Sequence, residues 1–405
     1  MSNLWSENKP SNFWQCPNGT DQALWREAEI KAAQSISSGL QQFSVDDILS
    51  WTLGEAQFGE SRWKLKPAYQ FYYRVRRFIP REFRHWLRSK IQTRLVPKNK
   101  LRWPVEDRYV QFQLNSLKHY LQISRLETIP FRNFWPEQNN FAFVITHDIE
   151  SQAGQRYASQ IADLEEGMGF HSSFNLVAED YKIDMGLIND LRNRGFEIGL
   201  HGLHHDDSLF KSMSTFKEQA SQTNAWLKKL NAVGFRSPST HRQPEWMQAL
   251  EVDYDLSFFD TDPWEPIPGG TMSIWPFFLG HFIELPYTLA QDNTVFNVLK
   301  EKTPRIWLEK VEFIRKNFGM ALVNTHPDYL QDNQIRDIYI DFLKAMKDMP
   351  DAWYALPAQV ANWWRIRQIA EDHSLPLELT YRTAYLDGNQ LLFTWQSDFI
   401  EEVEI

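Results

Sequence analysis

The stretch FAFVITHDIE, residues 141–150, carries the pattern that decides the fold. Its first six residues form a continuous apolar run with β-branched side chains, which is typical of a strand buried on both faces. Residues that can bind metal or move protons follow at once, namely His147, Asp148 and Glu150. The stretch therefore predicts a buried parallel strand with chemical groups at its carboxyl end.

Further strands and helices alternate along the chain after this stretch. Buried strands are predicted at SSFNLVA (172–178), FEIGLH (196–201) and MALVNTH (320–326). Helices are predicted from residue 155, after an N-cap at Asp184, at 214–230 with Thr215 and Glu218 as a capping box, at 303–319 and at 357–372. This alternation favours a parallel α/β architecture, most simply a barrel.

Three regions of the chain differ in their pattern of apolar and polar residues. Residues 1–135 are expected to form helices and irregular segments with no clear strand alternation. Residues 136–370 contain the predicted barrel. Residues 371–405 alternate around Asp387-Gly388, which predicts a β-hairpin appendage with a two-residue turn.

Composition limits the class of protein and the kind of site. The chain has no run of 18 apolar residues, and its first residues lack a basic start followed by an apolar core. We therefore expect neither a membrane-spanning helix nor a secretory signal, and a cytoplasmic location. Cys16 is the single cysteine, so an internal disulfide is excluded and any metal site must use His, Asp or Glu.

Basic residues concentrate between Arg62 and Arg102, where 14 lysines and arginines stand beside one acid, Glu82. Apolar residues recur every four positions in REFRHWLRSKIQTRLV (81–96), as on one face of a helix. Such a helix can contact an acidic membrane surface, a polyanion or this protein's own acidic main region. Nucleic acid is not expected, because no binding motif accompanies the charge. The sequence does not indicate whether the protein forms oligomers.

Histidines gather after the predicted strands. HGLHH (201–205) follows one strand, FRSPSTHR (235–242) contains Arg236, and THPD (325–328) places His326 after another. His201 and His205 are four residues apart, so a helical turn would point both imidazoles the same way. Two imidazoles and a carboxylate make a plausible site for Zn²⁺ or a similar divalent ion. His204 lies between the two and is interpreted as a supporting residue.

Five motifs in this order resemble the polysaccharide deacetylases of carbohydrate esterase family four. They are THDIE (146–150), HGLHH (201–205), FRSPS (235–239), YDLSFFDTDPW (254–264) and LVNTHPD (322–328). The similarity runs from about residue 141 to residue 367. It implies a distorted (β/α)7 barrel and the metal-dependent removal of an acetyl group from an N-acetylated sugar. It also implies His201 and His205 as metal ligands, Arg236 as the partner of a carboxylate base, and His326 as the acid for the leaving amine.

The first motif departs from the family's two adjacent aspartates. One reading puts Asp148 on the base position and Ile149, which cannot bind metal, on the ligand position. A second uses Asp148 for metal and His147 as base. A third, which we favour, uses Asp148 for metal and Glu150 as base, because alternate residues of an extended strand share a face.

Two other functions compete with the deacetylase. The same scaffold could bind a saccharide without catalysis, or hydrolyse a small amide that is not a sugar. Asp260, Asp262 and Trp264 are candidate substrate contacts on a loop over the cleft, whereas His241 and His281 are interpreted as structural.

Overall fold

The fold is built around a barrel of parallel strands. The computed structural model describes residues 4–37, 40, 43–65, 101–206, 208–267, 269–369 and 379–396. Within these residues, seven strands form the barrel: β2 (Phe141–Ile149), β3 (Ser173–Leu176), β4 (Glu197–Leu200), β5 (Gly234–Phe235), β6 (Tyr254–Asp255), β8 (Phe282–Glu284) and β9 (Met320–Thr325).

Parallel pairing carries the sheet round the barrel from β2 through β3, β4, β5 and β6 to β8, and β9 pairs back with β2. Leu289, which follows β8, donates its backbone N–H to the carbonyl of Leu322 in β9 at 3.1 Å and joins the two ends. The predicted distorted (β/α)7 barrel is confirmed. The distortion is clearest at β5 and β6, which have two residues each.

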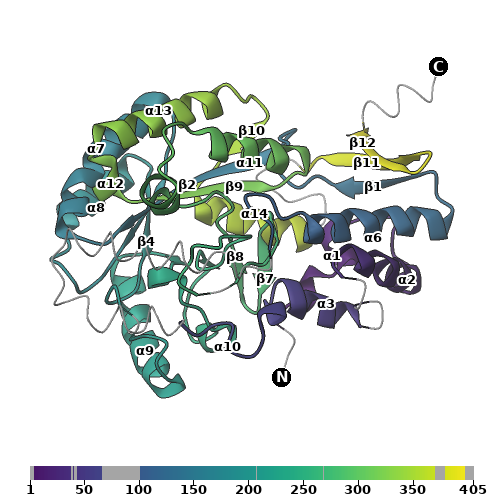
Figure 1. Cartoon of the computed structure of the whole chain (residues 1–405), viewed down its shortest axis with the longest axis horizontal. Helices are drawn as coiled ribbons and strands as arrows, with labels where there is room; N and C mark the ends of the chain where they lie inside the picture. Colours follow the sequence, from purple (N-terminus) through teal and green to yellow (C-terminus); the bar gives the residue numbers. More distant parts are fainter. Residues whose placement is uncertain are drawn as a thin grey trace.

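Helices cover the outside of the barrel, with α7, α8 and α13 grouped on one side (Figure 1). Asp184 caps α8 as predicted, by accepting from the N–H groups of Gly186 and Leu187. The start of α9 differs from the prediction, because Ser212 rather than Thr215 supplies its N-cap. The covering elements are α7 (Gln152–Met168), α8 (Met185–Asn193), α9 (Met213–Lys229), α10 (Pro244–Met247), the π-helical turn η8 (Asn293–Val298), α11 (Arg305–Lys316), α12 (Pro327–Leu330), α13 (Asn333–Lys347) and α14 (Pro357–Ile369).

A second, smaller sheet has the strand order β1-β11-β12 and is antiparallel, with β1 (Thr128–Arg132), β11 (Tyr381–Asp387) and β12 (Gln390–Trp395). The hairpin prediction is confirmed, but its two loop residues are Gly388 and Asn389, because Asp387 pairs with Gln390. The strand β1 was not predicted, since Pro130 weakens its strand signal and its partner lies far along the chain. Two further strands, β7 (Phe277–Leu279) and β10 (Ala352–Tyr354), pair with β8 and β2.

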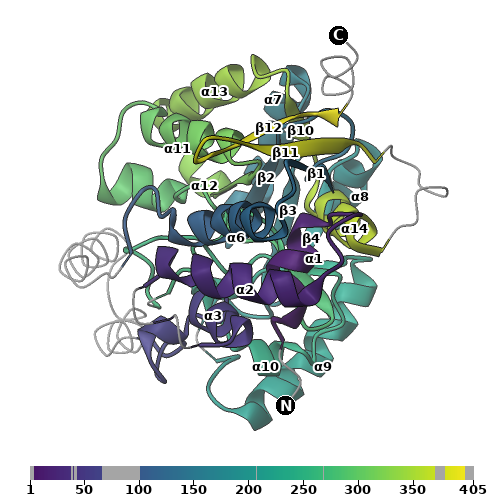
Figure 2. The same ribbon diagram turned by 90° about the vertical axis from the view of Figure 1, so that its right-hand side faces the viewer.

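The first part of the chain packs against the barrel and shares one continuous hydrophobic core with it. The ring of Phe13 lies 4.8 Å from that of Trp275. Figure 2 shows α1, α2 and α6 on this side of the molecule. The elements are η1 (Ser6–Asn8), α1 (Pro10–Trp14), α2 (Gln22–Ala32), η2 (Ala33–Ser35), α3 (Val45–Thr52), η4 (Ala56–Phe58) and α6 (Arg108–Ser124).

Two further expectations concern membranes. The predicted basic helix falls within residues 66–100 and lies outside the described residues. Its contact with a membrane surface, a polyanion or this protein's own acidic main region therefore stays a prediction. Among the helices that the structure describes, none has the length and apolar character needed to span a membrane.

Candidate metal centre

Side chains from three strand ends meet on one side of the barrel. A carboxylate oxygen of Glu150, directly after β2, lies 2.9 Å from Nε2 of His205, in the loop after β4. The same oxygen lies 3.4 Å from Nε2 of His326, directly after β9. The carboxyl ends of parallel strands face the same way, which explains why residues so far apart in sequence converge here.

Three residues at these strand ends form a cluster that could hold a metal ion. Glu150, His201 and His205 each offer one ligand atom, and these atoms lie within 4.8 Å of one another. The cluster contains Glu150, whereas the interpretation of the sequence had placed Asp148 among the ligands. Two imidazoles and one carboxylate match the donors that zinc and similar divalent ions accept, with positions left for water and substrate.

The protonation of His201 suits a ligand. Its Nδ1 lies 3.0 Å from the backbone carbonyl of Arg236, so Nδ1 carries the hydrogen and Nε2 keeps its lone pair. Burial lowers the pKa of His201 to about 4, which leaves the imidazole neutral at pH 7. A neutral imidazole fixed through its second nitrogen is the usual state of a histidine that binds metal.

The two histidines meet without the helical turn expected between them. Their ring centroids lie 5.3 Å apart. The intervening Gly202 has a φ of 76°, in the left-handed region, so the loop bends rather than coils. A Cβ at this position would lie 2.9 Å from the ring of Pro238, which also requires glycine.

Asp148 lies beside the cluster in a different environment. It is 4% exposed, and its Oδ1 accepts from Asn175 at 3.0 Å and from Arg236 at 3.1 Å. Its Oδ2 accepts from Asn324 at 2.8 Å and lies 3.9 Å from Nε2 of His201. Burial by itself would raise the pKa of Asp148, but Arg236 and the hydrogen bonds outweigh it, and the pKa lies below its ordinary value. Asp148 is therefore an ionised carboxylate with both oxygens engaged.

His326 is held by a residue that the sequence did not reveal. The buried Asp292, between β8 and α11, accepts from the backbone N–H of His326 at 2.6 Å, and its Oδ1 lies 2.7 Å from Nδ1 of that residue. Burial alone would lower the pKa of His326, but the charges of Asp292 and Glu150 raise it well above its usual value. No motif marks Asp292 in the sequence. The result is a protonated imidazole whose Nε2 lies 3.4 Å from the same Glu150 oxygen that His205 contacts.

Other polar residues serve different purposes. Asp148 and His147 point to opposite faces of β2, and His147 is fully buried between Glu165 and Thr325, with nitrogen–oxygen distances of 2.7 Å to each. The alternative in which His147 acts as the base is therefore wrong. His204 lies outside the metal cluster, with its Nδ1 at 2.8 Å from Asp180.

Residues 260–267 are all buried, which leaves little of their side chains exposed to a substrate. Asp260 forms a buried ion pair with Lys310, which makes it a structural residue. Trp264 is 8% exposed and packs edge-on against Trp103 at 4.6 Å. Asp262 accepts from the backbone N–H of Trp264 at 2.9 Å. The contact of Asp262 and Trp264 with a substrate stays a prediction.

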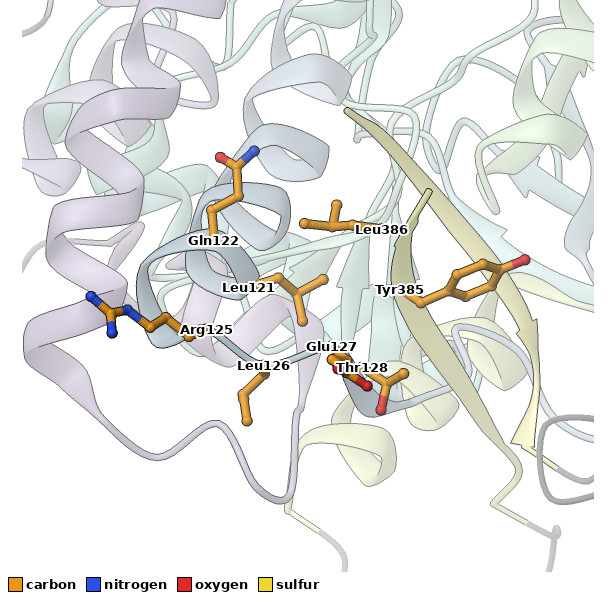
Figure 3. Close-up of a pocket in the computed structure, with 8 residues that line it drawn as sticks. All are labelled: Leu121, Gln122, Arg125, Leu126, Glu127, Thr128, Tyr385 and Leu386. Atoms are coloured by element: carbon orange, nitrogen blue, oxygen red, sulfur yellow. The ribbon is translucent and has the colours of Figure 1, made fainter. Parts of the chain in front are cut away.

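A separate pocket of about 550 Å³ lies away from the metal cluster, between the end of α6, β1 and β11 (Figure 3). In Figure 3 the guanidinium of Arg125 and the hydroxyl of Tyr385 point away from each other. The pocket contains no histidine and no converging polar groups, so it is a poor candidate for catalysis. Its lining residues are Leu121, Gln122, Arg125, Leu126, Glu127, Thr128, Tyr385 and Leu386.

Comparisons with known proteins bear on the fold. No protein-family model and no curated protein matches the sequence. A protein described as a polysaccharide deacetylase from Mycobacterium smegmatis is 17% identical, with 58% of this chain and 94% of that chain covered and a TM-score of 0.49. A second one, from Pseudomonas aeruginosa, is 14% identical with 58% and 95% covered and a TM-score of 0.48.

The solved structures that are similar to this one thus include proteins described as members of the family that the motifs resemble. An allantoinase is also similar, at 14% identity, 57% and 92% coverage and a TM-score of 0.47. These identities are no higher than 17% and the TM-scores no higher than 0.49, so the function of this chain rests on the geometry of its own site.

Proposed function

We propose that the protein is a metal-dependent hydrolase that removes the acetyl group from an N-acetylated sugar. One observation carries the hydrolytic part of this proposal. The ionised carboxylate of Asp148 lies 3.9 Å from Nε2 of His201, and the protonated imidazole of His326 lies 3.4 Å from a carboxylate oxygen of Glu150, so a base and an acid both lie beside the cluster of metal-ligand type. Hydrolysis of an amide needs such a pair, because a proton must leave water and another must reach the nitrogen.

Glu150, His201 and His205 would hold the metal. When bound, a divalent ion such as Zn²⁺ would polarise the carbonyl of the acetyl group and make water acidic enough to attack near neutral pH. The site fits such an ion through its neutral, oriented His201 and the mutual approach of the three ligand atoms. We thus assign Glu150 to the metal and Asp148 to proton transfer, the reverse of the assignment favoured from sequence.

Asp148 would take the proton of the attacking water. Arg236, Asn175 and Asn324 keep the carboxylate ionised and fix its plane, with donor–acceptor distances between 2.8 and 3.1 Å. Arg236 itself is 1% exposed and also donates to the carbonyl of Leu256. Arg236 is therefore a positioning residue for the base.

His326 would donate the proton that the leaving amine requires. Amide hydrolysis is slow partly because an amide anion is a very poor leaving group, so an acid on this side has a large effect. Asp292 keeps His326 protonated and holds its Nδ1, which directs Nε2 toward the site.

The sugar is the second part of the proposal. It rests on the five motifs that resemble polysaccharide deacetylases and on the names of the similar structures. Binding without catalysis is disfavoured by the complete set of ligand, base and acid. The cytoplasmic location also stays a prediction.

Metal content and acetate release of the same variants test the assignment. We expect close to one zinc per chain in the wild type, lost in Glu150→Ala, His201→Ala and His205→Ala. Asp148→Asn and His326→Ala should keep the metal and lose acetate release from N-acetylglucosamine oligomers. Asp341→Asn, on the exposed face of α13, serves as the control that changes neither. Metal lost from Asp148→Asn but kept in Glu150→Ala would restore the original assignment. A wild type that binds no added zinc would overturn the hydrolase.

A further inference from the structure

The three proposed ligands come from two loops that share no covalent connection near the site. Glu150 follows β2, whereas His201 and His205 follow β4. Between these strands lies β3, and the loop that follows it, residues 177–184, contacts both ligand loops. We call residues 177–184 the bridging loop.

One side of the bridging loop holds the histidine loop. The carboxylate of Asp180 accepts from the backbone N–H of His205 at 2.8 Å. Its other oxygen lies 2.8 Å from Nδ1 of His204. Two backbone bonds extend the contact, from Ala178 N–H to the carbonyl of Gly202 at 3.1 Å and from Glu179 N–H to that of Leu203 at 2.9 Å.

The next residue of the bridging loop holds the other ligand loop. The hydroxyl of Tyr181 donates to the carbonyl of Ile149 at 2.7 Å. Ile149 directly precedes Glu150, so this bond fixes the backbone from which the carboxylate ligand projects. The backbone N–H of Val177 contacts the same carbonyl at 3.4 Å.

We propose that Asp180 and Tyr181 are positioning residues that set the separation of Glu150 and His205, and thereby the affinity of the site for its metal ion. This inference rests on the metal site of the proposed function. Zinc–ligand bonds vary by only about 0.2 Å, so a small displacement between two loops weakens binding. Residues that hold ligands without touching metal typically contribute about 10- to 100-fold in affinity.

The experiment titrates the metal-free full-length protein with Co²⁺, followed by its visible absorption, and with Zn²⁺ in competition with a chelator. The variants are Asp180→Ala, Asp180→Asn and Tyr181→Phe. Lys182→Gln is the matched control for the first two, because Lys182 lies in the same loop and is exposed. Tyr157→Phe is the control for Tyr181→Phe, because its hydroxyl accepts from Arg336 outside the site.

We expect Asp180→Ala and Tyr181→Phe to weaken Zn²⁺ binding about tenfold or more and to change the Co²⁺ spectrum, while the melting temperature of the metal-free protein stays near that of the controls. Asp180→Asn should recover part of the loss, since its amide oxygen can still accept from His205. Wild-type affinity and an unchanged spectrum in Asp180→Ala and Tyr181→Phe would overturn the inference. So would equal losses in the controls. Failure of the wild type to bind either ion would instead overturn the proposed function.

Discussion

Replacement of Glu55 by glutamine should destabilise the whole chain, because Glu55 is the buried anion that joins the N-terminal region to the barrel. Glu55 and Arg242 form an ion pair in which neither side chain is exposed. Arg242 donates to both carboxylate oxygens, at 2.6 and 2.8 Å. The backbone N–H of Gly270 and the indole of Trp63 supply two further bonds, at 2.6 and 2.8 Å.

The magnitude follows from these four bonds. Glutamine would keep one acceptor oxygen but point its amide hydrogens at donors, and Arg242 would lose the buried carboxylate charge that it faces in this ion pair. Removal of one member of a buried pair typically costs about 3–5 kcal/mol. That is a large share of the roughly 5–15 kcal/mol that stabilises a folded protein. Unfolding should therefore begin at clearly lower urea concentration.

Urea unfolding of wild type, Glu55→Gln, Arg242→Gln and the double variant measures the coupling between the two residues. We expect the double variant to lose less stability than the sum of the single losses, because neither charge is then left alone. Lys31→Gln is the control, since Lys31 forms an exposed pair with Glu27 that contributes little. A loss below about 1 kcal/mol in Glu55→Gln would refute the reasoning.

Three further predictions concern the pKa of His326, the packing beside the proposed base and the pKa of Glu29. Asp292→Asn removes the charge that raises the pKa of His326, so the activity should decline at lower pH than in the wild type, as a pH–rate profile would show. Gly199→Ala would place a Cβ 2.1 Å from the amide oxygen of Asn175 and displace it from the proposed base, which should lower kcat about tenfold with zinc content unchanged. Burial raises the pKa of Glu29 to about 7, so the folded state binds more protons than the unfolded state between about pH 4.5 and 7, and stability falls as pH rises through that range. Glu29→Gln should remove up to roughly 3 kcal/mol of that fall, measured by urea unfolding at pH 5 and 8.

The parts of the fold that sequence predicts are those set by local patterns. The strand at 141–149 and the N-cap at Asp184 depend on neighbouring residues, and both were predicted. The strand β1 depends on pairing with β11, about 250 residues later, and was missed. The start of α9 was misplaced because Ser212 and Thr215 both offer a hydroxyl, and tertiary packing selects between them.

The same distinction between local patterns and tertiary contacts explains which site residues the sequence revealed. The residue types and strand ends identify which side chains converge, because the carboxyl ends of parallel strands must meet. Asp292 escaped notice because it acts on His326 from a connection with no motif of its own. Its role depends on tertiary structure alone.

The assignment of the two carboxylates could not come from spacing, since Asp148 and Glu150 share a face of the same extended segment. What separates them is their partners. Asp148 accepts from three amide or guanidinium groups that come from three other strands or strand ends, and its oxygens have little left to offer a metal. Glu150 contacts imidazole nitrogens instead, and its longer side chain reaches the histidine loop. The proposed exchange of roles therefore rests on these hydrogen bonds and contacts rather than on the motif.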